Sequence, residues 1–256
     1  MAELLVVPAL LAYIVAAFGY AGELRGPGLG GRLGTWGVRL GWLAQTALLV
    51  AQVATSDGFP WGTWAGSLNL FVWLVVGAYL IWGCTPRYRL LGLAVMPVAA
   101  VLLALAWVGG GTGVEEADRP GALLAFHVGL MLAGFAGFTL AAGMASLYLW
   151  QERRLKRHDR NVLRVRVPPL DALDRLAART VLVSLVLITL GIGVGAASFE
   201  RGDFDVAMAV TLGAWLVYAT QLALRRGGVW GRRAALLNLL GFLLVAIVLP
   251  ITHFAQ

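Results

Sequence analysis

The chain has 256 residues, of which 60% are hydrophobic and only 13% are charged, and its formal net charge is +7. A soluble globular domain carries about one-quarter charged residues, so the composition argues against an ordinary soluble enzyme or binding module. The single cysteine, Cys84, excludes an internal disulfide framework.

Long apolar stretches follow one another along the whole sequence. A stretch of about 20 apolar residues crosses the hydrocarbon core of a bilayer as a helix, which satisfies its own backbone polar groups. The short alternating segments of a β-barrel are missing from the sequence. We therefore predict an all-α fold, a polytopic membrane helical bundle in which residues 1–256 form a single domain. Its eight transmembrane helices are expected at about 3–22, 35–55, 67–83, 89–108, 122–150, 175–198, 205–224 and 233–253.

The connections between these helices alternate in charge. Every Lys and Arg of the chain falls on one predicted side of the membrane except Arg119 and Arg201, which lie among acidic residues on the other side. The positive-inside rule then places the basic connections in the cytoplasm and both termini outside. The longest basic connection, about 151–174, has neither interleaved aromatics nor a nucleic-acid-binding module, so we interpret it as a topology anchor that contacts anionic membrane lipid, with no nucleic-acid partner.

Glycines inside the apolar stretches indicate close helix packing. Gly191, Gly193 and Gly195 resemble part of a dinucleotide fingerprint, but that motif must follow a strand, and these glycines lie inside a predicted helix. Small residues spaced by four positions allow two helix backbones to approach each other. We expect this role for Gly191 and Gly195, and also for Gly129, Ala133, Gly137 and Ala141.

Two of the three histidines are candidates for chemistry. His158 lies among arginines and is interpreted as solvated, whereas His127 and His253 fall near the outer ends of their predicted helices, at the same depth. Ionisable groups bordering a membrane span are functional candidates, and neutral imidazole is a common axial ligand of heme iron. A lipid-facing hydrogen bond and a zinc site, which would need further ligands, are the alternatives. The C-x-x-C-H signature of covalent c-type attachment is absent, so any bound heme is expected to be non-covalent and b-type.

Other residues on the predicted outer side could assist such a site. Arg119 and Arg201 could pair with the two heme propionates, although neighbouring acidic residues are alternative partners. Trp61 and Trp64 could pack against a heme edge, or simply belong to the aromatic belt of a membrane protein.

Several stretches resemble the cytochrome c assembly protein family, the heme-handling group that includes CcsA- and HemX-like proteins. The similar segments are Gly58-Phe59-Pro60 through Trp73, His127-Val128 with the basic exit 147–156, the connection 167–176, the helix 187–195, Gly231-Arg232-Arg233, Gly241-Phe242 and His253. The resemblance implies a bacterial cytoplasmic membrane protein in which His127 and His253 flank a heme at the outer face. The connection 199–205 stands where family members carry a tryptophan-rich segment, but it contains no tryptophan and so departs from the family pattern. With this departure and its small size, the chain is more similar to the short HemX-like branch.

The leading hypothesis is a membrane protein that binds heme and holds or exports it at the outer face, in cytochrome c maturation or heme homeostasis. Its expected partners are membrane lipid and a cytochrome c maturation or heme-biosynthesis protein. The alternative is a regulatory or scaffold subunit that controls heme biosynthesis through the cytoplasmic basic connection without transporting heme. A small-solute transporter is a third reading, with Pro8 and Pro97 as its only candidate helix breaks, and no hydrolase or kinase constellation occurs.

Overall fold

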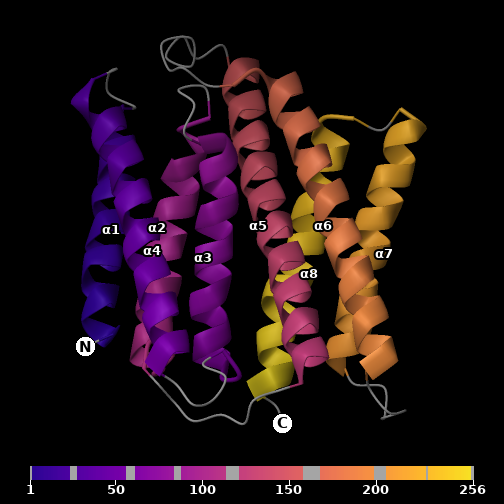
Figure 1. Ribbon diagram of the computed structural model, residues 1–256. Helices are drawn as coiled ribbons and strands as arrows, with labels where there is room; N and C mark the ends of the chain where they lie inside the picture. Colours follow the sequence, from indigo (N-terminus) through magenta and orange to yellow (C-terminus); the bar gives the residue numbers. More distant parts are fainter. Residues whose placement is uncertain are drawn as a thin grey trace. The chain divides into compact units, whose positions relative to one another are not determined.

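The computed structural model describes residues 2–23, 28–55, 61–83, 88–113, 121–157, 168–198, 206–228 and 230–254. They form a short 3-10 helix, η1 (Ala2–Leu5), and eight α-helices (Figure 1). The α-helices are α1 (Val6–Glu23), α2 (Leu29–Thr55), α3 (Trp64–Gly83), α4 (Leu91–Val108), α5 (Ala122–Lys156), α6 (Leu170–Ser198), α7 (Val206–Arg226) and α8 (Arg232–Phe254). Each predicted helix is present, so the all-α fold is confirmed.

Three helix bounds differ clearly from the prediction. Helix α2 begins at Leu29 rather than near residue 35, because its glycines pack against α1 instead of forming a loop. Helix α6 begins at Leu170 rather than near 175, directly after Pro169, whose carbonyl accepts hydrogen bonds from the first turn. Helix α5 continues to Lys156 rather than ending near 150, and in its last turn Lys156 pairs with Glu152 at 2.7 Å.

The helices pack as two compact units. Unit 1 contains the helices α1 to α4, and unit 2 contains the helices α5 to α8. In unit 1, α1 packs against α2 and α4, and α3 also packs against α2 and α4. Unit 2 repeats this order, with α5 against α6 and α8, and α7 also against α6 and α8. Each unit is therefore a ring of four consecutive helices, and the single domain over 1–256 stays a prediction.

Helices α1 and α2 of unit 1 approach each other through glycines. A methyl carbon built on Gly19 of α1 would lie 2.7 Å from the Gly34 nitrogen and 2.8 Å from the Gly30 oxygen of α2. Further along α2, a methyl carbon on Gly37 would lie 2.8 Å from the Ala12 oxygen. Glycine is required at these points because any side chain would force the backbones apart.

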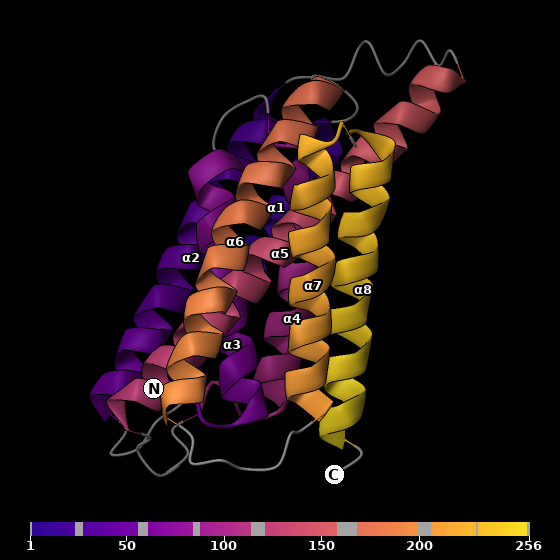
Figure 2. The same ribbon diagram turned by 90° about the vertical axis from the view of Figure 1, so that its right-hand side faces the viewer.

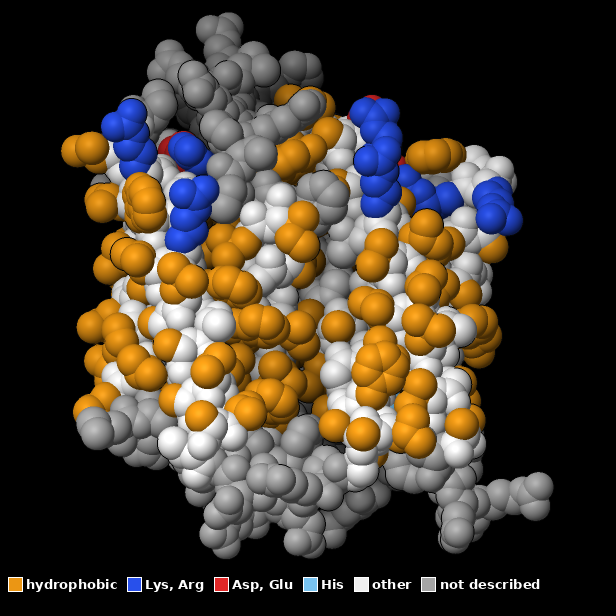
Figure 3. Space-filling view, in the orientation of Figure 1, with side chains coloured by type: hydrophobic (Ala, Val, Ile, Leu, Met, Phe, Trp, Pro, Cys, Tyr) orange, Lys and Arg blue, Asp and Glu red, His pale blue; other side chains and the backbone are white. Residues whose placement is uncertain are grey.

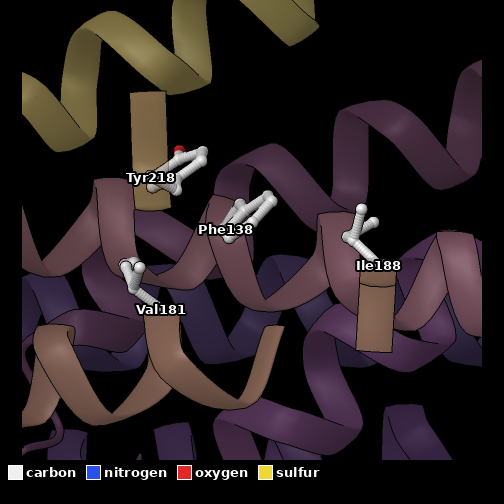
Figure 4. Packing of buried hydrophobic residues seen from close by; sticks show 5 residues of the cluster. Phe138, Val181, Ile188 and Tyr218 are labelled. Carbon is white, nitrogen blue, oxygen red and sulfur yellow. The ribbon is translucent and has the colours of Figure 1, made fainter. Parts of the chain in front are cut away.

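The core of unit 2 is aromatic and aliphatic (Figure 4). Phe138 of α5 and Tyr218 of α7 stack with their ring centroids 3.8 Å apart. The other buried members of the cluster are Ala141 of α5 and Val181 and Ile188 of α6. The Tyr218 hydroxyl donates a hydrogen bond to the Asn238 carbonyl of α8 at 3.2 Å. One buried cluster thus links all four helices of the unit.

Five helices are long and apolar enough to cross a membrane: α1, α3, α4, α5 and α6. Figure 3 shows hydrophobic side chains along the visible helices of both units, with Lys and Arg gathered at one end of each unit. We call the end of unit 2 that carries Arg153, Arg154, Arg157, Arg226 and Arg233 its basic end. The charge pattern agrees with the predicted alternation of connections, while the count of eight spans and the outer location of both termini stay predictions.

Candidate functional site

His127 is held against the neighbouring helix of unit 2. It lies in the second turn of α5, and its half-buried imidazole places Nδ1 2.7 Å from the carbonyl oxygen of Gly191 in α6. A carbonyl oxygen only accepts hydrogen bonds, so Nδ1 carries the proton and donates it. In the neutral ring the lone pair then belongs to Nε2, the nitrogen that can act as a metal ligand.

Gly195, one turn beyond Gly191 on α6, makes room for this imidazole. A methyl carbon built on Gly195 would lie 2.8 Å from Cε1 and 3.0 Å from Nδ1 of His127. Glycine is therefore needed here by the ring of His127 itself. The sequence singled out Gly191 and Gly195 as positions of close helix approach, and both lie in the contact with α5.

The remaining small residues of α5 divide into contacting and open positions. A methyl carbon on Gly134 would lie 2.5 Å from a side-chain carbon of Ile188, and one on Gly137 would overlap the Ser184 hydroxyl. Ala141 is fully buried in the same core. Gly129 has nothing within 4 Å of its added carbon, so its prediction as a helix-contact residue is wrong. The α5–α6 contact instead follows the line through Gly134 and Gly137.

The two candidate histidines belong to the same end of unit 2. Helix α5 starts at the end opposite the basic end, and α8 finishes there (Figures 1 and 2). His127 is five residues past the start of α5, and His253 is one residue before the last residue of α8. The helix directions thus give the two positions a shared end, in agreement with the sequence. The side chain of His253 lies outside the described residues, as do Arg119, Arg201, His158 and the connection 199–205.

The two candidate tryptophans belong to unit 1. Trp61 precedes α3, and its carbonyl accepts a hydrogen bond from the Ser67 hydroxyl at 2.7 Å. Trp64 is the first residue of α3, and a methyl carbon on Gly109 at the end of α4 would lie 2.5 Å from its ring. Both residues therefore help to join α3 to its neighbouring segments, and their packing against a heme edge stays a prediction.

A buried polar network in unit 1 was not singled out from the sequence. The Gln45 amide accepts a hydrogen bond from the Tyr13 hydroxyl at 2.7 Å and donates one to the Asn69 side chain at 2.9 Å. Asn69 donates to Gln52 at 3.3 Å, and Gln52 donates to the carbonyls of Gly111 and Gly113 at 3.1 and 2.8 Å. The sequence does contain a signal for this network, because polar amide side chains inside apolar spans are costly in hydrocarbon unless they are paired. The network joins α1, α2 and α3 to the turn after α4.

The basic end of unit 2 contains a buried ion pair. Arg225 of α7 donates two hydrogen bonds to the carboxylate of Asp174 in α6, one of them at 3.0 Å, and both side chains are less than a tenth exposed. The Gly231 amide also donates to Asp174 at 3.2 Å, and the Trp230 ring lies 4.6 Å from the Arg225 guanidinium carbon. The pair thus fastens α6 to the α7–α8 turn. The charge pattern of the sequence assigns Arg225 only to the basic side of the membrane and does not predict this structural role.

Comparison with known proteins decides the family. Residues 61–254 match the model of the family described as cytochrome C assembly protein. The chain belongs to this family. It is an integral membrane protein, as the apolar helices and the assembly family together show.

Relatives of this cytochrome c assembly protein include HemX of Brevibacillus brevis, which is 28% identical over 156 residues. That alignment covers 60% of this chain and 57% of HemX. An uncharacterized 28.8 kDa protein from a nifR3-like 5′ region of Azospirillum brasilense is 26% identical, with 96% of this chain and 94% of the relative aligned. The solved structure of the cytochrome c heme lyase CcmF matches the whole chain with a TM-score of 0.69 at 19% identity. The chain covers only 49% of CcmF, and at this identity the likeness shows a shared fold.

Proposed function

We propose that this membrane protein binds heme where α5 begins and α8 ends, and that it holds or exports heme during cytochrome c maturation or heme homeostasis. His127 and His253 are the proposed axial ligands. The observation that carries the proposal is the bond from His127 Nδ1 to the Gly191 carbonyl, 2.7 Å long.

That bond prepares His127 for a metal. Metal-ligating histidines commonly donate their other ring N–H to a carbonyl or carboxylate, which fixes the tautomer and the ring orientation. Gly191 supplies the acceptor, and Gly195 supplies the clearance for the ring. His127 therefore fits a heme iron through Nε2, and bound heme would supply an iron centre suited to ligand exchange or one-electron chemistry.

The comparisons supply the biological setting of the proposal. The family is described by cytochrome c assembly, and the protein of matching fold is named a heme lyase. For this chain we propose a non-covalent, b-type heme at the outer face of a bacterial cytoplasmic membrane, with both termini outside. Arg119 and Arg201 are proposed propionate contacts, and Trp61 and Trp64 are proposed to pack at the heme edge.

The test is the absorption spectrum of the full chain, purified in detergent from heme-replete cells and recorded oxidised and then reduced with dithionite. A sharp Soret band with resolved α and β bands after reduction is expected for a six-coordinate, low-spin heme. His127→Ala and His253→Ala should each remove the low-spin spectrum, and the double variant should lose the heme. His158→Ala is the control, and its spectrum should remain that of the unchanged protein.

Two results would contradict the proposal. Heme content that is unchanged in the His127→Ala, His253→Ala double variant would remove the ligand assignment. A spectrum without heme bands, even after hemin is added, would favour the regulatory or scaffold function instead. In that case scrambling residues 151–166 should abolish pull-down of a cytoplasmic partner.

A further inference from the structure

An open groove runs along one face of α5 at the basic end of unit 2. Its volume is about 470 Å³. Five residues of α5, the residue directly after α5 and one residue of α8 line it: Ser146, Leu149, Trp150, Arg153, Arg154, Arg157 and Leu239. The residues from Ser146 to Arg157 recur at intervals of three or four, so they form a single helical stripe roughly 16 Å long. Figure 2 shows the end of α5 extending past the first turn of α8.

The lining changes character along the stripe. Leu149 and Leu239 form its apolar part and pack with the small core cluster of Ala145 and Ala235. Trp150 follows, with the Arg154 guanidinium carbon 4.6 Å from the centroid of its ring. Arg153 and Arg157 complete the outer part. Apolar, aromatic and cationic groups therefore succeed one another in the order expected where a helix leaves the hydrocarbon for the headgroup layer.

The groove has a strong positive charge. Three of its seven lining residues are arginines, and none is acidic. The nearest acid in the sequence, Glu152, lies outside the lining and pairs with Lys156 at 2.7 Å. Arg153 and Arg157 have no ion pair with any residue in the described part of the chain. The arginines thus offer guanidinium donors, which suit the oxygens of a phosphate.

We propose that this groove binds one anionic phospholipid of the surrounding bilayer. The phosphate lies among Arg153, Arg154 and Arg157, and the upper acyl chains lie along Leu149 and Leu239. A free anion would use only the cationic part, and a neutral lipid would use only the apolar part. An anionic phospholipid can fill both parts, because its phosphate lies at the depth of the arginines and its acyl chains lie at the depth of the leucines. This site is separate from the proposed heme site and does not depend on it.

The experiment is native mass spectrometry of the detergent-purified full chain, titrated with phosphatidylglycerol or with phosphatidylcholine of the same acyl chains. One phosphatidylglycerol should be retained per chain, in preference to phosphatidylcholine. The R153Q/R154Q/R157Q variant should bind it at least tenfold more weakly. The matched control is R179Q/R226Q/R233Q, which removes the same charge from exposed arginines of unit 2 that do not line the groove. It should bind as the unchanged protein does.

A second variant, Leu239→Gln, tests the apolar wall without changing the charge, and it should also weaken retention of phosphatidylglycerol. Equal losses in both arginine triple variants would overturn the proposal, because binding would then reflect net charge alone. Displacement by inorganic phosphate would reassign the groove to free anions. Displacement by hemin would reassign it to heme carboxylates. Unchanged binding in R153Q/R154Q/R157Q would remove the site altogether.

Discussion

The two units place four consecutive helices in the same closed order, yet the side chains between those helices differ in kind. In unit 1, α1 and α2 meet through glycines, and buried amides of Gln45, Gln52 and Asn69 join α2 to α3 and, through the Tyr13 hydroxyl, to α1. In unit 2, the Phe138–Tyr218 stack fills the centre, and a buried ion pair closes the basic end. The same packing order of four helices can therefore be stabilised by different kinds of side-chain contact. Both candidate histidine ligands, His127 and His253, lie on helices of unit 2.

The largest expected effect tests the ion pair of unit 2. Arg225→Met leaves the Asp174 carboxylate buried without its cation, which should cost about 3–5 kcal/mol in the free energy of unfolding. Thermal unfolding of the purified chain in detergent, followed by circular dichroism, should show a markedly lower Tm. The D174L/R225M variant should recover most of the loss, since it removes both charges.

The control for this prediction is the exposed pair of Asp171 and Arg175, one turn apart on α6. Arg175→Met should change the unfolding free energy by less than about 1 kcal/mol, because water already screens this pair. If Arg225→Met were as mild as Arg175→Met, the buried pair would not be what fastens the α7–α8 turn.

The next effect concerns the amide network of unit 1. Asn69→Leu removes the donor and acceptor between Gln45 and Gln52, and leaving their amides buried without partners should cost about 1–3 kcal/mol. Hydrogen exchange should speed up in α2, α3 and the turn after α4, while unit 2 keeps its protection. Thr55→Val, which removes an exposed hydroxyl bond at the end of α2, is the control and should leave exchange in both units unchanged. Uniform loss of protection in both units would contradict the separation of their cores.

An effect of similar size separates closely packed glycines from open ones on the same helix. Gly19→Ala should destabilise the protein by about 1–3 kcal/mol, because the added carbon overlaps the α2 backbone. Gly22→Ala, three residues later, has nothing within 4 Å of its added carbon, and alanine's helix preference should make it neutral or slightly stabilising. The two Tm values measure the difference directly. Equal Tm values would mean that α1 and α2 separate easily.

The smallest effect sharpens the heme site of unit 2 and rests on the proposed function. Gly195→Ala should push the His127 ring away from the Gly191 carbonyl, and the loss of about one hydrogen bond should weaken hemin binding by up to about tenfold. Hemin titrations followed at the Soret band measure the change. Gly193→Ala, an open position on the same helix, is the matched control. Identical affinities of the two variants would show that Gly195 does not position His127.

Much of the fold could be predicted from one-dimensional signals. Apolar stretches located every helix, and the alternation of basic connections matches the basic end of each unit. The predicted start of α2, near residue 35, is too late because the glycines between 29 and 34 lower the local helix propensity. In the structure these glycines are helical because they allow α2 to approach α1 closely. The early start of α6 at Leu170 likewise depends on the Pro169 carbonyl, which the apolar pattern does not include.

The candidate site could be predicted only in part. Depth along the helices was enough to assign His127 and His253 to one end. The acceptor for His127 was not foreseeable, because Gly191 lies 64 residues away and contributes only a backbone carbonyl. The same limit applies to the ion pair of Asp174 and Arg225, which are 51 residues apart. Pairings of this kind depend on which faces of two helices meet, and a pattern along a single helix does not contain that information.

Helix α5 carries His127 near one end and the arginine groove near the other, with 19 residues from His127 to Ser146 and therefore about 28 Å between them. Because the helix is continuous, the two positions are held at a fixed angular offset around the helix axis, about 100°, as well as at a fixed axial separation. Deleting one residue between them would shorten the helix by only about 1.5 Å, but it would rotate the groove residues by about 100° around the helix axis relative to His127. Outside the closely packed positions Gly134, Gly137 and Ala141, the segment should therefore accept many apolar substitutions, but it should accept no single-residue insertion or deletion. At those other positions the property under constraint is a rotation angle, and not the identity of the side chain.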